Sequence, residues 1–261
     1  MLIVKVPSIN GLEKTKGCEK APNKILEALK DIYLTEEEKE IKYAIDEIAI
    51  DKNNIEKTNK SIFDKAKELI KKEKDKTIFL GGDHNISYSL LKAFSSVHES
   101  SGLIVFDAHA DCMHNFKPPT HEDWLRVLIE EGFPAENIIL VGLRDYHKIE
   151  KEFLHFKQIN CFSCKELFEN LQESCDSIME AAKAFPSLYI SIDVDVTDPA
   201  FAPATGYIEP AGLSSREFLY LLQRLLLLKN LKAADIVEIN PDKDINNLTA
   251  KLGAKILAEL I

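Results

Sequence analysis

Short runs of apolar residues recur along the chain, and most of the segments between them repeat their apolar residues with helical spacing. Runs this short, rich in Ile, Val, Leu and Phe, predict buried strands. We place the strands at residues 2–6, 45–50, 76–80, 103–106, 138–141, 158–162, 188–192 and 234–239. The runs at 45–50 and 158–162 are the weakest of the set.

The intervening segments carry an apolar side and a charged side when read at the period of a helix. In 53–74, for example, Ile55, Ile62 and Leu69 recur at helical spacing among many Lys and Glu residues. Residues 10–30 run from a loop into a helix. Further helices are expected at 53–74, 85–97, 121–131, 164–184, 214–229 and 246–260.

This alternation of strands and helices predicts a three-layer αβα fold of the α/β class. Short apolar strands joined by helices favour a mostly parallel sheet, here of about eight strands, covered on both faces. No Gly-, Ser- or Pro-rich linker divides the chain, so a single catalytic domain over residues 1–261 is expected.

Composition excludes several classes of partner. The formal charge of −10 argues against binding to nucleic acid or to an anionic membrane surface. No apolar run approaches the length of a membrane span. The five cysteines show no paired framework, which favours a reducing cytoplasm. Cys161 and Cys164 form a CxxC without a second ligand pair, so we interpret them as ordinary thiols.

Polar residues with metal-binding chemistry follow four of the predicted strands. In open α/β sheets, ligands bind beyond the carboxyl ends of the strands. Alternate residues of an extended segment point the same way, so Asp193 can face the same centre as Asp195. Desolvating such carboxylates beside one another is costly unless a cation compensates. The candidate metal ligands are His84, Asp107, His109, Asp111, Asp193 and Asp195.

The ligand types indicate the kind of metal. Carboxylate and imidazole without thiolate suit Mn²⁺, with Co²⁺, Ni²⁺, Fe²⁺ or Zn²⁺ as alternatives. Six ligands are too many for one ion that keeps an open position, whereas two ions could share them. Two divalent ions about 3.5–4 Å apart can lower the pKa of a bridging water enough to give hydroxide near neutral pH.

Three motifs resemble the metal-binding signatures of the ureohydrolases, the arginase/agmatinase family. They are Gly81-Gly-Asp-His84, Asp107-Ala-His-Ala-Asp111 and the stretch 191–210, and the likeness extends to 17–22, 141–145 and 238–241. The resemblance implies the arginase-type fold, the six ligands above and two Mn²⁺ ions. It also implies hydrolysis of a small cationic guanidino substrate to an amine and urea by a metal-bridging hydroxide, in a homo-oligomer, commonly a trimer or hexamer.

The resemblance assigns two catalytic residues and one supporting residue. Glu238 matches the carboxylate that binds the guanidinium, which could form a bidentate pair. His121 resembles the histidine that shuttles a proton to the leaving nitrogen. Asp198 would orient the ligands from outside the first coordination shell.

The substrate tail is less sharply indicated. Arginases bind the amino-acid end of arginine with an Asn and an Asp at the positions that Met113 and His147 hold here. The stretches 81–94 and 198–203 look more like the agmatinase branch, for which Glu122 or Asp123 could bind the distal ammonium. A guanidino acid such as guanidinobutyrate would instead suit the cationic candidates Lys117, His114 and His147. A formimidoylglutamate hydrolase is disfavoured because Asp83 stands where that branch departs from the pattern.

Two other functions are compatible with parts of the sequence. Asp193-Val-Asp-Val-Thr197 also fits the DxDxT nucleophile motif of haloacid-dehalogenase-type phosphatases. That motif normally follows the first strand of its domain, and it leaves 107–111 unexplained. A metal-binding homologue that has lost turnover is the second alternative.

Overall fold

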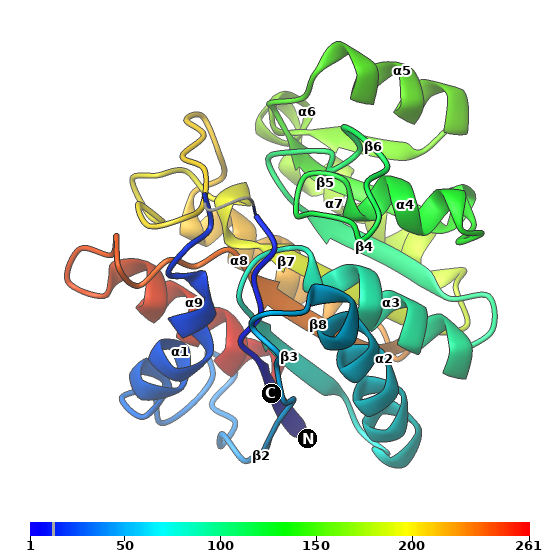
Figure 1. The fold of residues 1–261 in the computed structure, drawn as a ribbon. Helices are drawn as coiled ribbons and strands as arrows, with labels where there is room; N and C mark the ends of the chain where they lie inside the picture. The colour runs from blue at the N-terminus through cyan, green and yellow to red at the C-terminus, as the bar shows by residue number, and fades with distance from the viewer. Residues whose placement is uncertain (12–13) are drawn as a thin grey trace.

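The strands form one eight-stranded sheet in which every neighbouring pair is parallel. The computed structural model describes residues 1–11 and 14–261, so residues 12–13 of the predicted N-terminal loop lie outside it. The spatial order is β2-β1-β3-β8-β7-β4-β5-β6 (Figure 1). The strands are β1 (Leu2–Val6), β2 (Ala44–Glu47), β3 (Thr77–Gly81), β4 (Gly102–Phe106), β5 (Ile138–Leu143), β6 (Asn160–Ser163), β7 (Leu188–Asp193) and β8 (Leu231–Val237).

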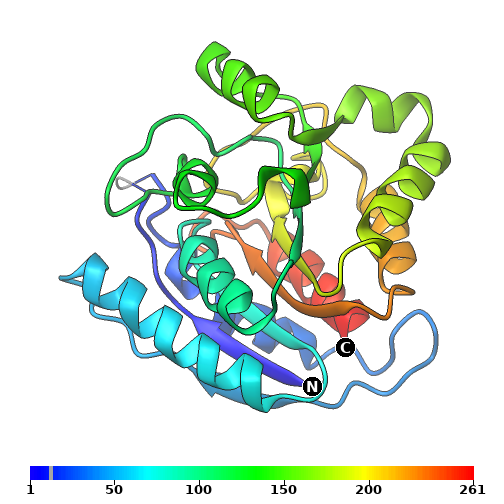
Figure 2. The ribbon, with the colours of Figure 1, turned by 90° about the vertical axis from the view of Figure 1, so that its right-hand side faces the viewer.

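Helices cover both faces of the sheet, which confirms the predicted three-layer αβα fold (Figure 2). One apolar core lies between the sheet and α1 (Ala21–Leu29), α6 (Cys164–Glu169), α7 (Leu171–Lys183), α8 (Ser215–Leu225) and α9 (Leu248–Leu260). The other core lies between the opposite face and α2 (Ile55–Lys72), α3 (Ile86–Val97), α4 (Trp124–Glu130) and α5 (Lys148–Lys157). None of the helices in the described residues has the length and apolar character needed to cross a membrane.

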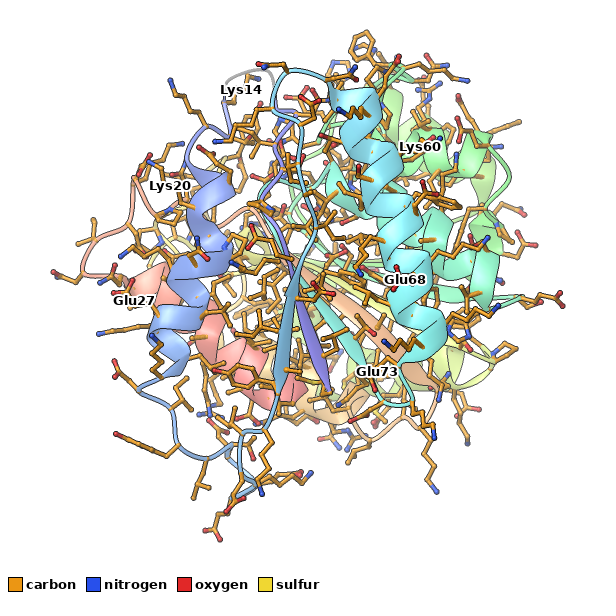
Figure 3. The ribbon with its side chains drawn as sticks, turned by 60° about the horizontal axis from the view of Figure 1, so that its bottom comes forward. Lys14, Lys20, Glu27, Lys60, Glu68 and Glu73 are labelled. Carbon is orange, nitrogen blue, oxygen red and sulfur yellow. The ribbon has the colours of Figure 1, made fainter. Side chains whose placement is uncertain are left out.

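Helix α2 illustrates how the polar pattern sets a layer. Asn54 caps its N-terminus by accepting a hydrogen bond from the backbone N–H of Lys57 at 2.9 Å. Ile62 and Leu69 are buried in the core, whereas Lys60 and Glu68 project into solvent (Figure 3). The burial of this stripe holds the helix on the sheet.

The structure corrects the predicted elements in three places. Helix α5 was not predicted, and it buries Leu154 while leaving Ile149 and Phe156 exposed. The single helix predicted at 164–184 is divided into α6 and α7, because the backbone leaves the helical conformation at Asn170 (φ −151°, ψ 68°). Helix α4 begins at Trp124, so His121 precedes it and does not open it.

The order of the strands brings the polar strand ends together. The four strands followed by the candidate ligands and by Glu238 are β3, β8, β7 and β4, which are consecutive neighbours in the middle of the sheet. Because all of them are parallel, their carboxyl ends meet at one edge. Side chains from four distant parts of the chain therefore converge on one place.

Candidate metal centre

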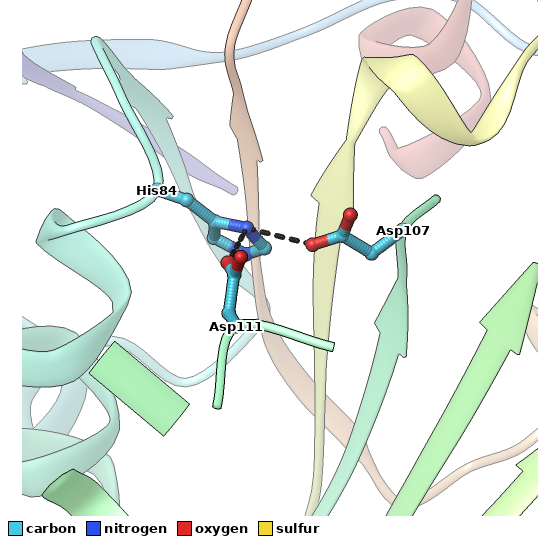
Figure 4. Close-up of side chains that lie close together, drawn as sticks. All are labelled: His84, Asp107 and Asp111. Atoms are coloured by element: carbon cyan, nitrogen blue, oxygen red, sulfur yellow. Dashed lines mark ion pairs between the residues drawn. The ribbon is translucent and has the colours of Figure 1, made fainter. Parts of the chain in front are cut away.

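His84 faces three carboxylates from other strand ends. Its Nδ1 atom lies 3.0 Å from Asp107 Oδ2 and 2.9 Å from Asp111 Oδ2 (Figure 4). The same atom lies 3.4 Å from Asp193 Oδ2. His84 and Asp107 are almost fully buried, and Asp111 is 8% exposed. One imidazole and three carboxylates thus form a compact oxygen- and nitrogen-lined group of the kind that binds a divalent ion.

His109 forms a second group beside the first. Its Nδ1 atom lies 3.0 Å from Asp195 Oδ2 and 3.4 Å from Asp107 Oδ1. Asp107 therefore belongs to both groups, with one carboxylate oxygen turned toward each histidine. A shared carboxylate between two clusters is the arrangement expected for a pair of ions.

The buried negative charges of the His84 and His109 groups favour the binding of cations. His84 Nδ1 is buried without a hydrogen-bond partner, while its Nε2 atom lies 2.9 Å from Ser191 Oγ. Burial lowers the pKa of His84, but the surrounding carboxylates outweigh this and raise the pKa well above its ordinary value. Burial and the neighbouring Asp107 raise the pKa of Asp111 to about 7. Divalent ions would neutralise these crowded acids, so the residues fit a two-metal centre.

Local backbone contacts aim the ligands. Asp111 adopts a left-handed conformation (φ 49°), and its Oδ2 atom accepts a hydrogen bond from Trp124 Nε1 at 2.6 Å. Asp193 Oδ1 accepts from the backbone N–H of Asp195 at 2.8 Å. Such strained or tightly bonded positions concentrate at functional sites, where surrounding contacts hold them.

Arg144 binds two loops at the edge of the centre. Its guanidinium donates to the carbonyl oxygens of Asp195 at 2.6 Å, Glu209 at 2.7 Å and Pro210 at 3.0 Å. The backbone that carries Asp195 is thereby tied to the loop at 209–210.

Glu238 lies directly after β8 with φ at 65° and points toward the same centre. Its Oε1 atom accepts a hydrogen bond from the backbone N–H of His84 at 2.9 Å and lies 3.3 Å from His121 Nδ1. A Cβ on Gly206 would come within 2.4 Å of Glu238 Oε2, so only glycine leaves room for this carboxylate. The two predicted catalytic residues are therefore buried side by side.

Glu238 is expected to control the protonation of His121. Burial lowers the pKa of His121, but the hydrogen bond to Glu238 and the negative charges of Glu238, Asp83 and Asp111 together outweigh it and raise the pKa to about 9. Glu238→Gln should move that pKa down toward the ordinary value of 6.5, measurable by NMR titration of the imidazole. Protonated His121 stabilises the fold fully below about pH 6.5, and this contribution is lost as the pH rises through about 9.

Glu122→Gln is the matched control for this titration. The Glu122 carboxylate lies 3.9 Å from His121 Nε2, beyond hydrogen-bond distance, so its loss should move the pKa of His121 far less. An unchanged titration in Glu238→Gln would contradict the assignment of Glu238 as the partner that holds the proton.

The two histidine groups open into a cavity of about 490 Å³. Besides His121, Glu238 and the ligands His84, His109, Asp111, Asp193 and Asp195, its wall holds residues that the sequence did not single out as site residues. Those additional residues are Lys14, Asp145, Tyr146, Glu150 and Tyr207. Met113, Glu122 and His147, which were considered for the substrate tail, also line it.

The ring of Tyr207 lies between the imidazole rings of His109 and His121. Its ring stacks on that of His121 with centroids 5.6 Å apart and meets the ring of His109 edge-on at 5.7 Å. Its hydroxyl donates to Glu122 Oε1 at 2.5 Å and accepts a hydrogen bond from Lys14. Since Lys14 also bonds to Glu122, the three side chains close one side of the cavity.

Some predicted side chains do not reach the cavity. The Asp123 carboxylate is buried but accepts hydrogen bonds from the backbone N–H groups of Phe116 and Thr120. His114 and Lys117 are exposed and are not among the lining residues. The Asp198 carboxylate accepts hydrogen bonds from the backbone N–H groups of Ala200 and Gly212, and its role in orienting the ligands stays a prediction.

Comparison with known proteins gives one family. The family model described as the arginase family matches residues 1–261. An arginase of Staphylococcus aureus (strain COL) is 32% identical over 197 residues, which cover 69% of this chain and 65% of that protein. The chain thus spans about 65% of the length of these first curated relatives.

Solved structures share the whole fold. Formimidoylglutamase from Bacillus subtilis subsp. subtilis str. 168 superposes with a TM-score of 0.92 at 26% identity, covering 99% of this chain and 85% of that chain. Agmatine ureohydrolase of Thermoplasma volcanium gives a TM-score of 0.86 at 25% identity, covering 99% and 87% respectively. The names of these relatives differ in the compound they act on, so the substrate must be argued from the cavity.

Proposed function

Since the chain belongs to the arginase family, we propose that it is a two-metal hydrolase that cleaves a linear guanidino cation to an amine and urea. The observation that carries this proposal is Asp107, shared by two histidine groups that open into the cavity beside Glu238. His84, Asp107, Asp111 and Asp193 would hold one ion, and His109, Asp107 and Asp195 the other. Bound divalent ions, Mn²⁺ by ligand type, supply a water acidic enough to act as nucleophile near neutral pH.

Glu238 supplies the anchor for the substrate. A guanidinium is planar and cationic, and a carboxylate pairs with it through two parallel hydrogen bonds. Glu238 is 4% exposed, so such a pair would be shielded from water and strong. Its backbone and the adjacent Gly206 fix the carboxylate in one position, which would hold the guanidinium carbon over the metal centre.

His121 supplies the proton that the leaving nitrogen needs. An amine leaves poorly unless it is protonated, which calls for an acid within hydrogen-bond reach. His121 Nδ1 lies beside Glu238, and its buried Nε2 atom has no hydrogen-bond partner. With a pKa of about 9 the imidazole carries a proton at neutral pH, so it can donate one there.

The charge of the cavity wall favours a substrate with a second cation. Beyond the metal ligands and Glu238, the wall holds the carboxylates of Glu122, Asp145 and Glu150. Among the described residues of that wall the one lysine is Lys14, which is already paired with Glu122. A cationic tail would meet the exposed Asp145, whereas a carboxylate tail would be repelled. The buried Glu150 adds negative charge behind the wall, where its two oxygens accept hydrogen bonds from the backbone N–H groups of Cys112 and His147. Agmatine, a guanidinium joined to an ammonium by a short chain, is therefore the proposed substrate.

A urea-release assay with Mn²⁺ tests the substrate. We expect agmatine to give the highest kcat/KM among agmatine, arginine, guanidinobutyrate, guanidinopropionate and free guanidine, with N-formimidoylglutamate assayed by formamide release. Asp145→Asn should raise KM for agmatine by about tenfold and change kcat little, because the lost contact lies at the tail. The same substitution should leave a substrate without a second cation unaffected.

Other outcomes of this assay favour the other candidates. Guanidinobutyrate as the best substrate would reverse the charge argument, and arginine as the best would place an amino-acid group against Met113 and His147. Silence over the whole panel with metal bound would indicate a homologue without turnover. Release of phosphate from simple esters would be needed for the DxDxT phosphatase interpretation, which the family match does not support.

Two further properties stay predictions. A homo-oligomer, trimeric or hexameric, is expected from the family resemblance and is measurable by light scattering. A cytoplasmic location is expected from the five cysteines, which form no disulfide in the structure.

A further inference from the structure

A chain of buried polar groups lies behind the metal centre. His84 Nε2 is 2.9 Å from Ser191 Oγ, and Ser191 Oγ is 2.7 Å from Asp235 Oδ1. The other oxygen of Asp235 accepts hydrogen bonds from Ser87 Oγ and Tyr189 OH, each at 2.8 Å. All of these residues are 0–1% exposed. These hydrogen bonds connect side chains of α3, β7 and β8.

The direction of the hydrogen bonds determines the tautomer of His84. A serine hydroxyl has one proton. If Ser191 donates that proton to the Asp235 carboxylate, its oxygen can only accept from His84, so the proton of the imidazole must sit on Nε2. The Nδ1 lone pair is then free and faces Asp107 and Asp111, which is the form needed to bind a metal ion.

We propose that Ser191 and Asp235 are positioning residues that hold His84 in its metal-binding tautomer and raise its affinity for the ion. The proposal rests on the two-metal centre argued above and concerns only the His84 group. The imidazole gains positive character when a cation binds at Nδ1. The Asp235 carboxylate, acting through the Ser191 hydroxyl, stabilises that charge.

The cost of burying Asp235 argues against a role in stability alone. The carboxylate is fully buried in the middle of β8 among apolar residues and has no Lys or Arg partner in the described part of the chain. Replacing such buried charges by apolar side chains is often neutral or stabilising. A metal ion bound at His84 would be stabilised by the negative charge of this carboxylate, which explains the burial of Asp235 better than packing does.

The test compares metal binding in three variants of the full chain. Ser191→Ala removes the hydroxyl that links Asp235 to His84 by hydrogen bonds. Asp235→Asn removes the negative charge with little change in the shape of the side chain. Tyr189→Phe is the matched control, because it removes a hydrogen bond to Asp235 and leaves the His84–Ser191–Asp235 path intact. Mn²⁺ titrations by calorimetry and EPR should show one of the two dissociation constants raised about 10- to 100-fold in the first two variants. Tyr189→Phe should stay within about threefold of wild type.

A second measurement does not depend on metal or turnover. In metal-free protein, at a pH above the raised pKa of His84 so that the imidazole is neutral, two-bond ¹H–¹⁵N spectra should show His84 as the Nε2–H tautomer. Ser191→Ala should give a mixture of tautomers, whereas Tyr189→Phe should not.

Several results would overturn the proposal. They are equal Mn²⁺ affinities in Ser191→Ala and wild type, an equal loss in Tyr189→Phe, or an Nδ1–H tautomer in the wild-type protein. If Asp235→Asn fails to fold, Ser191→Ala alone decides. A wild-type protein that binds Mn²⁺ but releases no urea would contradict the proposed substrate chemistry and leave this test fully usable. A wild-type protein that binds no Mn²⁺ would overturn both.

Discussion

Asp107→Asn is expected to abolish hydrolysis and to weaken the binding of both metal ions. Asp107 is the one carboxylate whose two oxygens face the two histidine groups, Oδ2 toward His84 and Oδ1 toward His109. Breaking a buried charge pair by removing one partner costs about 3–5 kcal/mol. At 1.4 kcal/mol for each factor of ten, the affinity for Mn²⁺ should fall on the order of 10²–10³-fold.

Mn²⁺ titration and thermal unfolding together measure this effect. Ligand at 100 times its dissociation constant stabilises the native state by about 2.7 kcal/mol. That corresponds to a rise in Tm of roughly 5–10 °C at 2–4 °C per kcal/mol. Wild-type protein should show this rise on adding Mn²⁺ and lose it with a chelator, and Asp107→Asn should show almost none.

Glu122→Gln serves as the control for Asp107→Asn. Its carboxylate lines the same cavity but belongs to neither histidine group, so the Mn²⁺-dependent rise in Tm should persist. A full Mn²⁺ response in Asp107→Asn, with both ions still bound, would mean that the two groups do not share this ligand.

Glu238→Gln is expected to separate binding of metal from turnover. The amide oxygen of Gln can still accept the hydrogen bond from the backbone of His84, so the local fold and the Mn²⁺ affinity should persist. The negative charge that pairs with the guanidinium is lost. Removing one partner of a buried, hydrogen-bonded charge pair costs about 2–5 kcal/mol, so kcat/KM should fall on the order of 10²–10³-fold.

A second substitution at Glu238 tests whether the negative charge is what matters. Glu238→Asp keeps the charge but withdraws it by one methylene, so it should retain more activity than Glu238→Gln if charge is what matters. Steady-state urea release with Mn²⁺ in excess measures both variants. Activity of Glu238→Gln within about threefold of wild type would exclude this residue as the guanidinium partner.

Much of the fold follows from local patterns of the chain. The central strands β3 and β4 are predominantly apolar because both of their faces are covered, and such runs stand out in a sequence. The strand predicted at 234–239 runs from Leu231 to Val237 in the structure. It ends before Glu238 because the backbone turns to positive φ at that residue. Helix α5 was missed because its cap is His147, a residue type that seldom signals a helix start.

The ligands could be predicted because carboxylates and imidazoles at strand ends are unusual in a core. The cavity wall could not, since Lys14, Glu150 and Tyr207 come from three loops or helices that only the tertiary structure brings together. Asp235 did carry a signal that was overlooked. A lone Asp within the buried strand Leu231–Val237 is costly to bury, so it marks a candidate functional residue.

The cavity is lined by the ends of central strands and by loops, which differ in how well they tolerate substitution. Its floor stands on the ends of central strands, which are locked by neighbours on both sides, whereas its far wall stands on loops and on the start of α5. Loops tolerate substitution and insertion far better than central strands do. A grafted segment at 145–150 should therefore change the tail preference of the proposed hydrolase and leave its reaction chemistry intact, which makes the scaffold a starting point for engineering.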